Sequence, residues 1–132
     1  MKVVYAGDLR CEATHLRSGN KLTTDAPPDN NGKGEAFSPS DLLCTSLASC
    51  MITLMGITAA KKEIPFENAE ANIEKVMASE PRRVSQIIID LRIKDMGYGE
   101  REKKLLQAAA HACPVAHSIH PDIVQTISFE FY

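Results

Sequence analysis

The 132-residue sequence predicts a single α+β domain, residues 1–132, in which antiparallel sheets pack on a long, buried central helix. Three observations support this fold class. Residues 38–62 form an apolar stretch with clear helix start and stop signals. Strand-like alternation of apolar and polar residues precedes and follows that stretch, and a second, shorter helical pattern lies near the C-terminus.

Short strands are expected within residues 2–25. Apolar and polar residues alternate there, and turn signals at residues 7–8 and 17–20 divide the segment. Residues 26–36 are rich in Pro, Gly and Asn, so we expect a loop that leads the chain to the central helix.

The central helix has strong signals at both ends. Ser38 is a good N-cap, Pro39 suits the first helical position, and Asp41 completes a capping box. The lysines at 61–62 complement the negative end of the helix dipole, and Pro65 prevents continuation. One face carries an apolar series: Leu43, Leu47, Cys50, Met51, Leu54 and Ile57. Since other faces are also apolar, the helix is expected to be nearly buried, and a homodimer would cover what one short chain cannot.

The remaining elements follow in order. Two strands are predicted at residues 69–79 and 84–94, joined as a hairpin. Residues 100–112 have the pattern of an amphipathic helix. A further helical turn is expected over 114–119, and residues 123–131 alternate as a C-terminal strand.

The composition argues against nucleic-acid-binding, exported and membrane proteins. The net charge is −2, Trp is absent and no basic run occurs, so a nucleic-acid partner is not expected. No export signal is seen, and the longest apolar run, broken by Ser and Thr, falls short of a membrane span. We therefore expect a cytoplasmic protein whose four cysteines are mostly reduced thiols.

Two cysteines are candidates for chemistry. Cys113 precedes Pro114 at a predicted helix N-terminus, where amide groups and the dipole would favour a thiolate. Cys50 lies in mid-helix, so a reactive thiol there needs a nearby cation such as Arg or His. The alternative is that both are small buried apolar residues. Cys44 and Cys11 are expected to serve packing.

A metal site is a second alternative. His111, Cys113, His117 and His120 have a spacing that could supply ligands, although Pro114 interrupts any regular helical presentation. No nucleotide-binding or hydrolase motif is present, and no cofactor is expected.

Two motifs together resemble one family. S-P-S-D-L-L-C-T-S-L-A-S-C-M around Cys50 and A-H-A-C-P-V-A-H-S around Cys113 are similar to the OsmC/Ohr proteins, the osmotically inducible and organic hydroperoxide resistance proteins. The order of elements matches along essentially the whole chain. The resemblance implies an OsmC-like fold and an intertwined homodimer with an active site at each interface.

The resemblance also implies an activity. It implies a thiol peroxidase that reduces organic hydroperoxides, with Cys50 as the peroxidatic residue and Cys113 as the resolving residue, reset by an external dithiol. The family uses an arginine of the N-terminal region to activate the thiolate. Arg17 is the best-placed match, and Arg10 is the second.

One departure from the family pattern stands out. Ohr-type proteins carry a glutamate where this sequence has Ser40, and Asp41 or Glu35 would have to replace it. The departure indicates a divergent OsmC-like member with weaker or different activity. A non-catalytic module that binds a small hydrophobic ligand at the dimer interface is therefore the alternative function.

Overall fold

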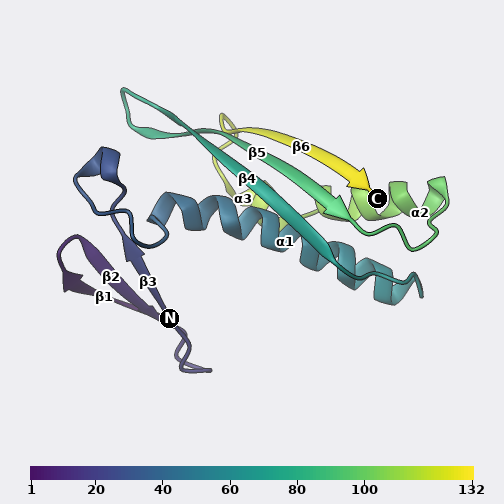
Figure 1. Ribbon diagram of the computed structural model, residues 1–132, viewed down its shortest axis with the longest axis horizontal. Helices are drawn as coiled ribbons and strands as arrows, with labels where there is room; N and C mark the ends of the chain where they lie inside the picture. Colours follow the sequence, from purple (N-terminus) through teal and green to yellow (C-terminus); the bar gives the residue numbers. More distant parts are fainter. The chain divides into compact units, whose positions relative to one another are not determined.

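A computed structural model describes all residues, 1–132 (Figure 1). The chain divides into two compact units, residues 1–43 and residues 44–132. The elements, in order, are β1 (Lys2–Gly7), β2 (Arg10–Thr14), β3 (Lys21–Asp25), the 3-10 turn η1 (Pro28–Asn30), α1 (Pro39–Lys61), β4 (Ala69–Ala78), β5 (Arg83–Ile93), α2 (Glu100–His111), α3 (Pro114–Ser118) and β6 (Val124–Phe131). The predicted α+β class is confirmed, and each predicted helix and strand agrees with an observed one to within about two residues.

The first unit contains a three-stranded antiparallel sheet in the order β1-β2-β3. Gly7, with φ of 88°, makes the tight turn into β2. The loop after β3 folds back closely on itself: a Cβ at Gly32 would lie 1.7 Å from the Ala26 carbonyl oxygen. Only glycine fits there, so this position fixes the path of the chain from β3 towards α1.

The start of α1 has the predicted capping box. The Ser38 backbone N–H donates to Asp41 Oδ2 at 2.8 Å, and the Asp41 N–H donates to Ser38 Oγ at 3.1 Å. These bonds satisfy amide donors that the first helical turn cannot pair internally. The helix therefore begins where the sequence predicts.

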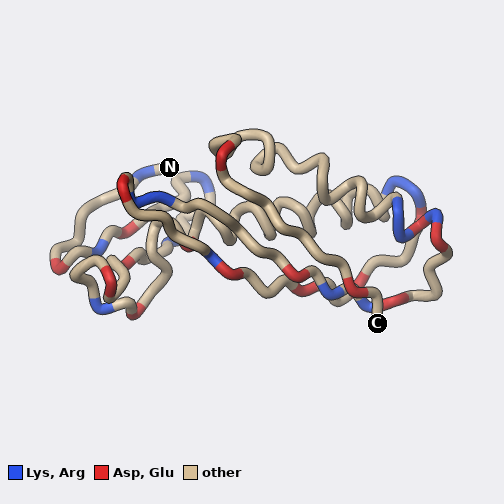
Figure 2. Tube along the Cα trace, turned by 90° about the horizontal axis from the view of Figure 1, so that it is seen from above, with Lys and Arg blue, Asp and Glu red and all other residues tan.

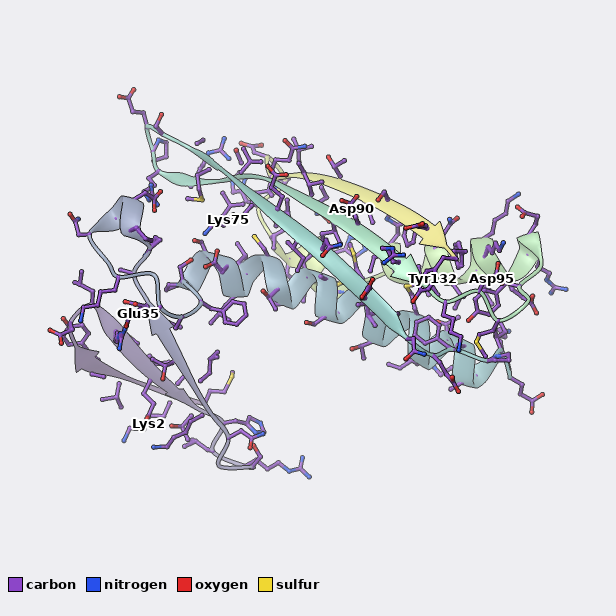
Figure 3. All side chains as sticks on the ribbon, viewed as in Figure 1. Lys2, Glu35, Lys75, Asp90, Asp95 and Tyr132 are labelled. Atoms are coloured by element: carbon purple, nitrogen blue, oxygen red, sulfur yellow. The ribbon has the colours of Figure 1, made fainter.

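The second unit contains a three-stranded sheet in the order β4-β5-β6. The β4–β5 pair is an antiparallel hairpin, whereas β5 and β6 are parallel. Antiparallel sheets were predicted, and the last pair differs because α2 and α3 carry the chain back to the start of β5 before β6 begins. The end of β6 is tied down, since Asp95 N–H donates to the Tyr132 carbonyl at 2.7 Å (Figure 3).

The core lies on one face of the second sheet, the side on which Figure 1 shows α1 and α2. The β5 residues of that face have no exposed surface, and neither do several side chains on the two helices. They are Ile87, Ile89, Leu91 and Ile93 on β5, Leu47 and Met55 on α1, and Leu106 and Ala110 on α2. The opposite face is polar, with Arg92 bridging Glu70 and Glu130.

α1 is less buried than the sequence suggests. Only 33% of its most apolar 18-residue window is buried, and Ile57 is 44% exposed. No charged residue occurs between Leu42 and Ala60, whereas charged positions mark the strands and the region of α2 (Figure 2). By length and mean hydropathy (1.8), α1 does meet the criterion for a membrane-crossing helix, contrary to the expectation. One such helix is weak evidence, because the core helix of a soluble protein meets the same criterion.

Candidate active site

The second unit brings Cys50 and Cys113 together, although 62 other residues separate them in the sequence. Cys50 is half-buried on α1, and Cys113 is the fully buried N-cap residue of α3. Their side chains are close enough for Cys50 to influence the pKa of Cys113. Cys113 Sγ also donates to the Leu47 carbonyl oxygen of α1, at 3.9 Å. Both cysteines are free thiols in this structure.

The electrostatics of Cys113 differ from the prediction. Burial and the interaction with the Cys50 side chain raise the pKa of Cys113, and the backbone amides of Ala116 and Val115 lower it by less. The expected bias towards a thiolate was therefore wrong. The amides were placed correctly, but α3 has only five residues, and removal of the thiol from water outweighs so short a helix.

The two thiols differ in their exposure to solvent. Cys50 keeps some contact with solvent, while Cys113 has none. A small oxidant that approaches this pair from solvent therefore meets Cys50 first. Two thiols close to each other can be joined as a disulfide after one of them is oxidised to a sulfenic acid. The arrangement can thus support two-electron redox chemistry with separate roles for the two sulfurs.

The first unit contains a charged cluster around Arg10, made with Asp25 and Glu35. Arg10 Nη2 lies 3.2 Å from Asp25 Oδ2 and also pairs with Glu35, which is labelled in Figure 3. The Glu35 backbone N–H donates to the same Asp25 oxygen at 2.9 Å. The Asp25 side chain has no exposed surface. That amide bond, together with Arg10, holds the pKa of Asp25 below its usual range, and the two carboxylates raise the pKa of Arg10.

Asp25 was not singled out from the sequence. A signal for it exists in the hairpin between β2 and β3, because the observed register places Arg10 directly opposite Asp25. Opposite charges at paired positions of an antiparallel sheet attract each other. Periodicity alone does not fix a register, and so the pair could not be read in advance.

The structure also places the other residues predicted to activate the Cys50 thiolate, namely Arg17 and the substitutes for the family's glutamate. Arg17 is exposed in the turn between β2 and β3. Asp41 takes part in the helix cap, and Ser40 Oγ is 3.1 Å from Ser38 Oγ. Glu35, one of the two proposed substitutes for the family's glutamate, pairs with Arg10.

The remaining cysteines and histidines do not gather into a site. Cys44 is 2% exposed on α1, and Cys11 is half-buried in β2. His111 packs edge-on against Phe129 at 5.6 Å, and His120 Nδ1 accepts a hydrogen bond from a neighbouring backbone amide. No group of three or more His, Cys, Asp or Glu side chains is placed to hold a metal ion. The geometry therefore gives the metal alternative no support.

Comparisons with known proteins agree with this arrangement. The sequence profile of the OsmC-like protein family matches residues 32–128, and the chain belongs to that family. A crystal structure from Psychrobacter arcticus 273-4, provisionally described as an osmotic stress induced and detoxification response protein, is 52% identical, with a TM-score of 0.91 over 97% of this chain and 93% of that chain. A search among curated proteins finds no match.

More distant structures share the fold. The organic hydroperoxide resistance protein OsmC of Legionella pneumophila is 20% identical, with a TM-score of 0.75 over 98% of this chain and 97% of its own. A protein of Vibrio cholerae, provisionally described as an organic hydroperoxide resistance protein with captopril bound in one of its active sites, is 16% identical, with a TM-score of 0.70 over 98% and 91% of the two chains. At these identities the likeness defines the fold alone.

Proposed function

We propose that this protein is a two-cysteine thiol peroxidase that reduces organic hydroperoxides. The Cys50 thiolate attacks the hydroxyl oxygen of the peroxide, so the O–O bond breaks, an S–O bond forms and Cys50 becomes a sulfenic acid, while the alkoxide takes a proton from solvent and leaves as an alcohol. The Cys113 sulfur then attacks the sulfenic sulfur. An S–S bond forms, the S–O bond breaks, and the hydroxyl leaves as water with the Cys113 proton. An external dithiol restores both thiols by exchange and is itself oxidised to a disulfide.

The proximity of the two thiols is the observation that carries the proposal, since Cys113 contacts α1 at Leu47, one turn before Cys50, and the Cys50 side chain influences the pKa of Cys113. A resolving cysteine must reach the sulfenic sulfur without large movement, because a disulfide tolerates only a narrow geometry. Membership of the OsmC-like family and the hydroperoxide resistance described for more distant relatives support the same chemistry. The proposal includes a role in antioxidant stress response in the cytoplasm.

The activating arginine is part of the proposal. A guanidinium near Cys50 would stabilise its thiolate and hydrogen-bond the peroxide. Arg17 is exposed, whereas Arg10 pairs with Asp25 and Glu35. Replacing each by Lys tests them separately: the activating residue is the one whose loss slows peroxide consumption tenfold or more.

We also propose that the protein acts as a homodimer. Large apolar side chains are exposed on both the first sheet and α1, including Val3 and Tyr5 at 65%, Leu22 at 40% and Ile57 at 44%. A three-stranded sheet that leaves such residues in water needs a covering surface. Light scattering coupled to size-exclusion chromatography should give twice the chain mass, and a monomeric mass at micromolar concentration would contradict this proposal.

The function is tested by stopped-flow reaction of pre-reduced protein with cumene hydroperoxide. Wild-type protein should consume the peroxide rapidly and stoichiometrically, while Cys50→Ser should lose this reaction. Cys11→Ser is the matched control, because it removes a half-buried thiol outside the pair and should react like wild type. Slow consumption that is unchanged in Cys50→Ser would overturn the peroxidase and favour the module that binds a hydrophobic ligand.

A further inference from the structure

The second unit has an open cavity between the segment that follows α1 and the start of α2. Figure 1 shows the end of α1 and the start of α2 at the same end of this unit. The cavity measures about 260 Å³ and is lined by Lys62, Ile64, Arg101, Glu102 and Leu105. Pockets for drug-sized ligands usually measure about 300–1,000 Å³, so this one suits a smaller molecule. Cys50 lies roughly three helical turns before this end of α1.

The wall that follows α1 is held in place by hydrogen bonds on both sides. Glu63 has a φ of 56°, in the left-handed region, and this conformation reverses the chain at the end of the helix. The Ile64 N–H then donates to the Ala59 carbonyl oxygen at 2.9 Å. On the other side, the Tyr98 hydroxyl donates to the Pro65 carbonyl oxygen at 2.6 Å. This wall is therefore preformed.

The opposite wall is the first turn and a half of α2. The Gly99 N–H donates to Glu102 Oε2 at 2.7 Å, which fixes the start of the helix. Leu106 has no exposed surface, so the core holds this part of α2 in place. Arg101 and Leu105 are four residues apart and therefore lie on the same side of the helix. A cationic and an apolar side chain thus line this wall together.

The two cations of the cavity have no partner within the protein. Lys103 on the same helix pairs with Asp95 at 2.9 Å, whereas Lys62 and Arg101 make no ion pair and no side-chain hydrogen bond. Figure 2 shows basic positions gathered at this end of the second unit. Glu102 supplies the one carboxylate of the lining, and it accepts the capping bond described above. The lining therefore carries a net positive charge of one.

We propose that this cavity binds a small amphiphilic carboxylate, a second ligand site that is separate from the cysteine pair. The carboxylate lies between Lys62 and Arg101, because a guanidinium presents parallel N–H donors that match a carboxylate. The alkyl chain lies against Ile64 and Leu105, which are both half-buried. One net positive charge complements a singly charged anion better than a phosphate dianion. The inference does not depend on the proposed peroxidase activity.

The test is a titration of the full chain with sodium hexanoate, followed by NMR of the assigned backbone amides. Saturable shifts are expected at residues 62–64 and 101–105, and hexanol, which has the same chain length without the charge, should bind much more weakly. Arg101→Gln should weaken hexanoate binding roughly five- to tenfold, through loss of charge-assisted hydrogen bonds. Lys104→Gln is the matched control, because Lys104 is exposed on α2 but does not line the cavity, and its affinity should equal that of wild type.

Four results would overturn the inference. They are hexanoate shifts that do not saturate or that lie elsewhere in the chain, equal affinities for hexanoate and hexanol, equal affinities for hexanoate and inorganic phosphate, and unchanged hexanoate binding in Arg101→Gln. Arg101 is exposed, so its replacement should leave the fold intact, and the amide spectrum of the variant reports this directly. The titration uses no hydroperoxide, so its outcome is independent of the peroxidase assay.

Discussion

Two neighbouring isoleucines of β5 allow a sharp test of which sheet face forms the core. Ile89 has no exposed surface and lies opposite Ile73 and Ile127, whereas Ile88 is half-buried on the other face, opposite Glu74 and Thr126. Truncation of a fully buried isoleucine to alanine typically costs about 2–5 kcal/mol, because apolar contacts are lost and a cavity remains. Ile88→Ala removes the same atoms from a site with fewer contacts and should cost about 1 kcal/mol.

The assay is urea unfolding of both variants, followed by circular dichroism, with the free energy of unfolding taken by linear extrapolation. Each series is run at several protein concentrations, since dimerisation would make the apparent stability depend on concentration. Ile89→Ala should lose at least twice as much free energy of unfolding as Ile88→Ala. Equal losses, or a larger loss for Ile88→Ala, would refute the assignment of the covered face.

Three further predictions concern the loop, the pH dependence and the charged cluster. Gly32→Ala should lower the free energy of unfolding by about 1–3 kcal/mol, because the added methyl group would clash with the Ala26 carbonyl. Gly99→Ala is the control, since a Cβ at Gly99 would meet only ordinary contacts. Equal losses of stability for the two variants in chemical denaturation would contradict the close approach at Gly32. Tyr98 donates to the Pro65 carbonyl at 2.6 Å, and burial raises the pKa of Tyr98, so stability should fall as pH rises above about 10. Tyr98→Phe should cost about 0.5–1.5 kcal/mol at neutral pH and lose less stability in alkali, and a wild-type-like alkaline loss would argue against this cause. Because the pKa of Asp25 is lowered, its contribution is present above about pH 4 and disappears as pH falls through the folded pKa, and an acid-unfolding midpoint unchanged in Asp25→Asn would contradict the buried carboxylate.

The elements predicted from the sequence are those with local signals. The limits of α1 follow from Ser38, Pro39 and Asp41, which act within one helical turn, and the structure contains the bonds that their spacing predicts. β5 was predicted from its alternating isoleucines, which the structure divides between a buried and a more open face. Strand direction leaves no such local trace, which is why the parallel pairing of β6 with β5 was not foreseen.

The motifs singled out Cys50 and Cys113, and the structure places the two side chains near each other. Their roles in catalysis stay a prediction. The charge state of Cys113 was missed because it depends on burial by distant elements, which outweighs the local amides. The Arg10–Asp25 pair was missed because it depends on strand register. Features that depend on neighbouring residues in the sequence, such as helix caps and motifs, could be predicted. Strand register and the pKa of a buried thiol depend on tertiary contacts and could not.

The central claim is that Cys50 and Cys113 form one redox unit. The most direct test treats fully reduced protein with one equivalent of cumene hydroperoxide and maps the products by mass spectrometry of unreduced peptides. A single disulfide joining Cys50 to Cys113 is expected. It should be lost in Cys113→Ser, where Cys50 should remain as a sulfenic acid that dimedone traps. A protein whose Cys50 and Cys113 both remain thiols, or whose disulfide involves Cys11 or Cys44 instead, would contradict the account.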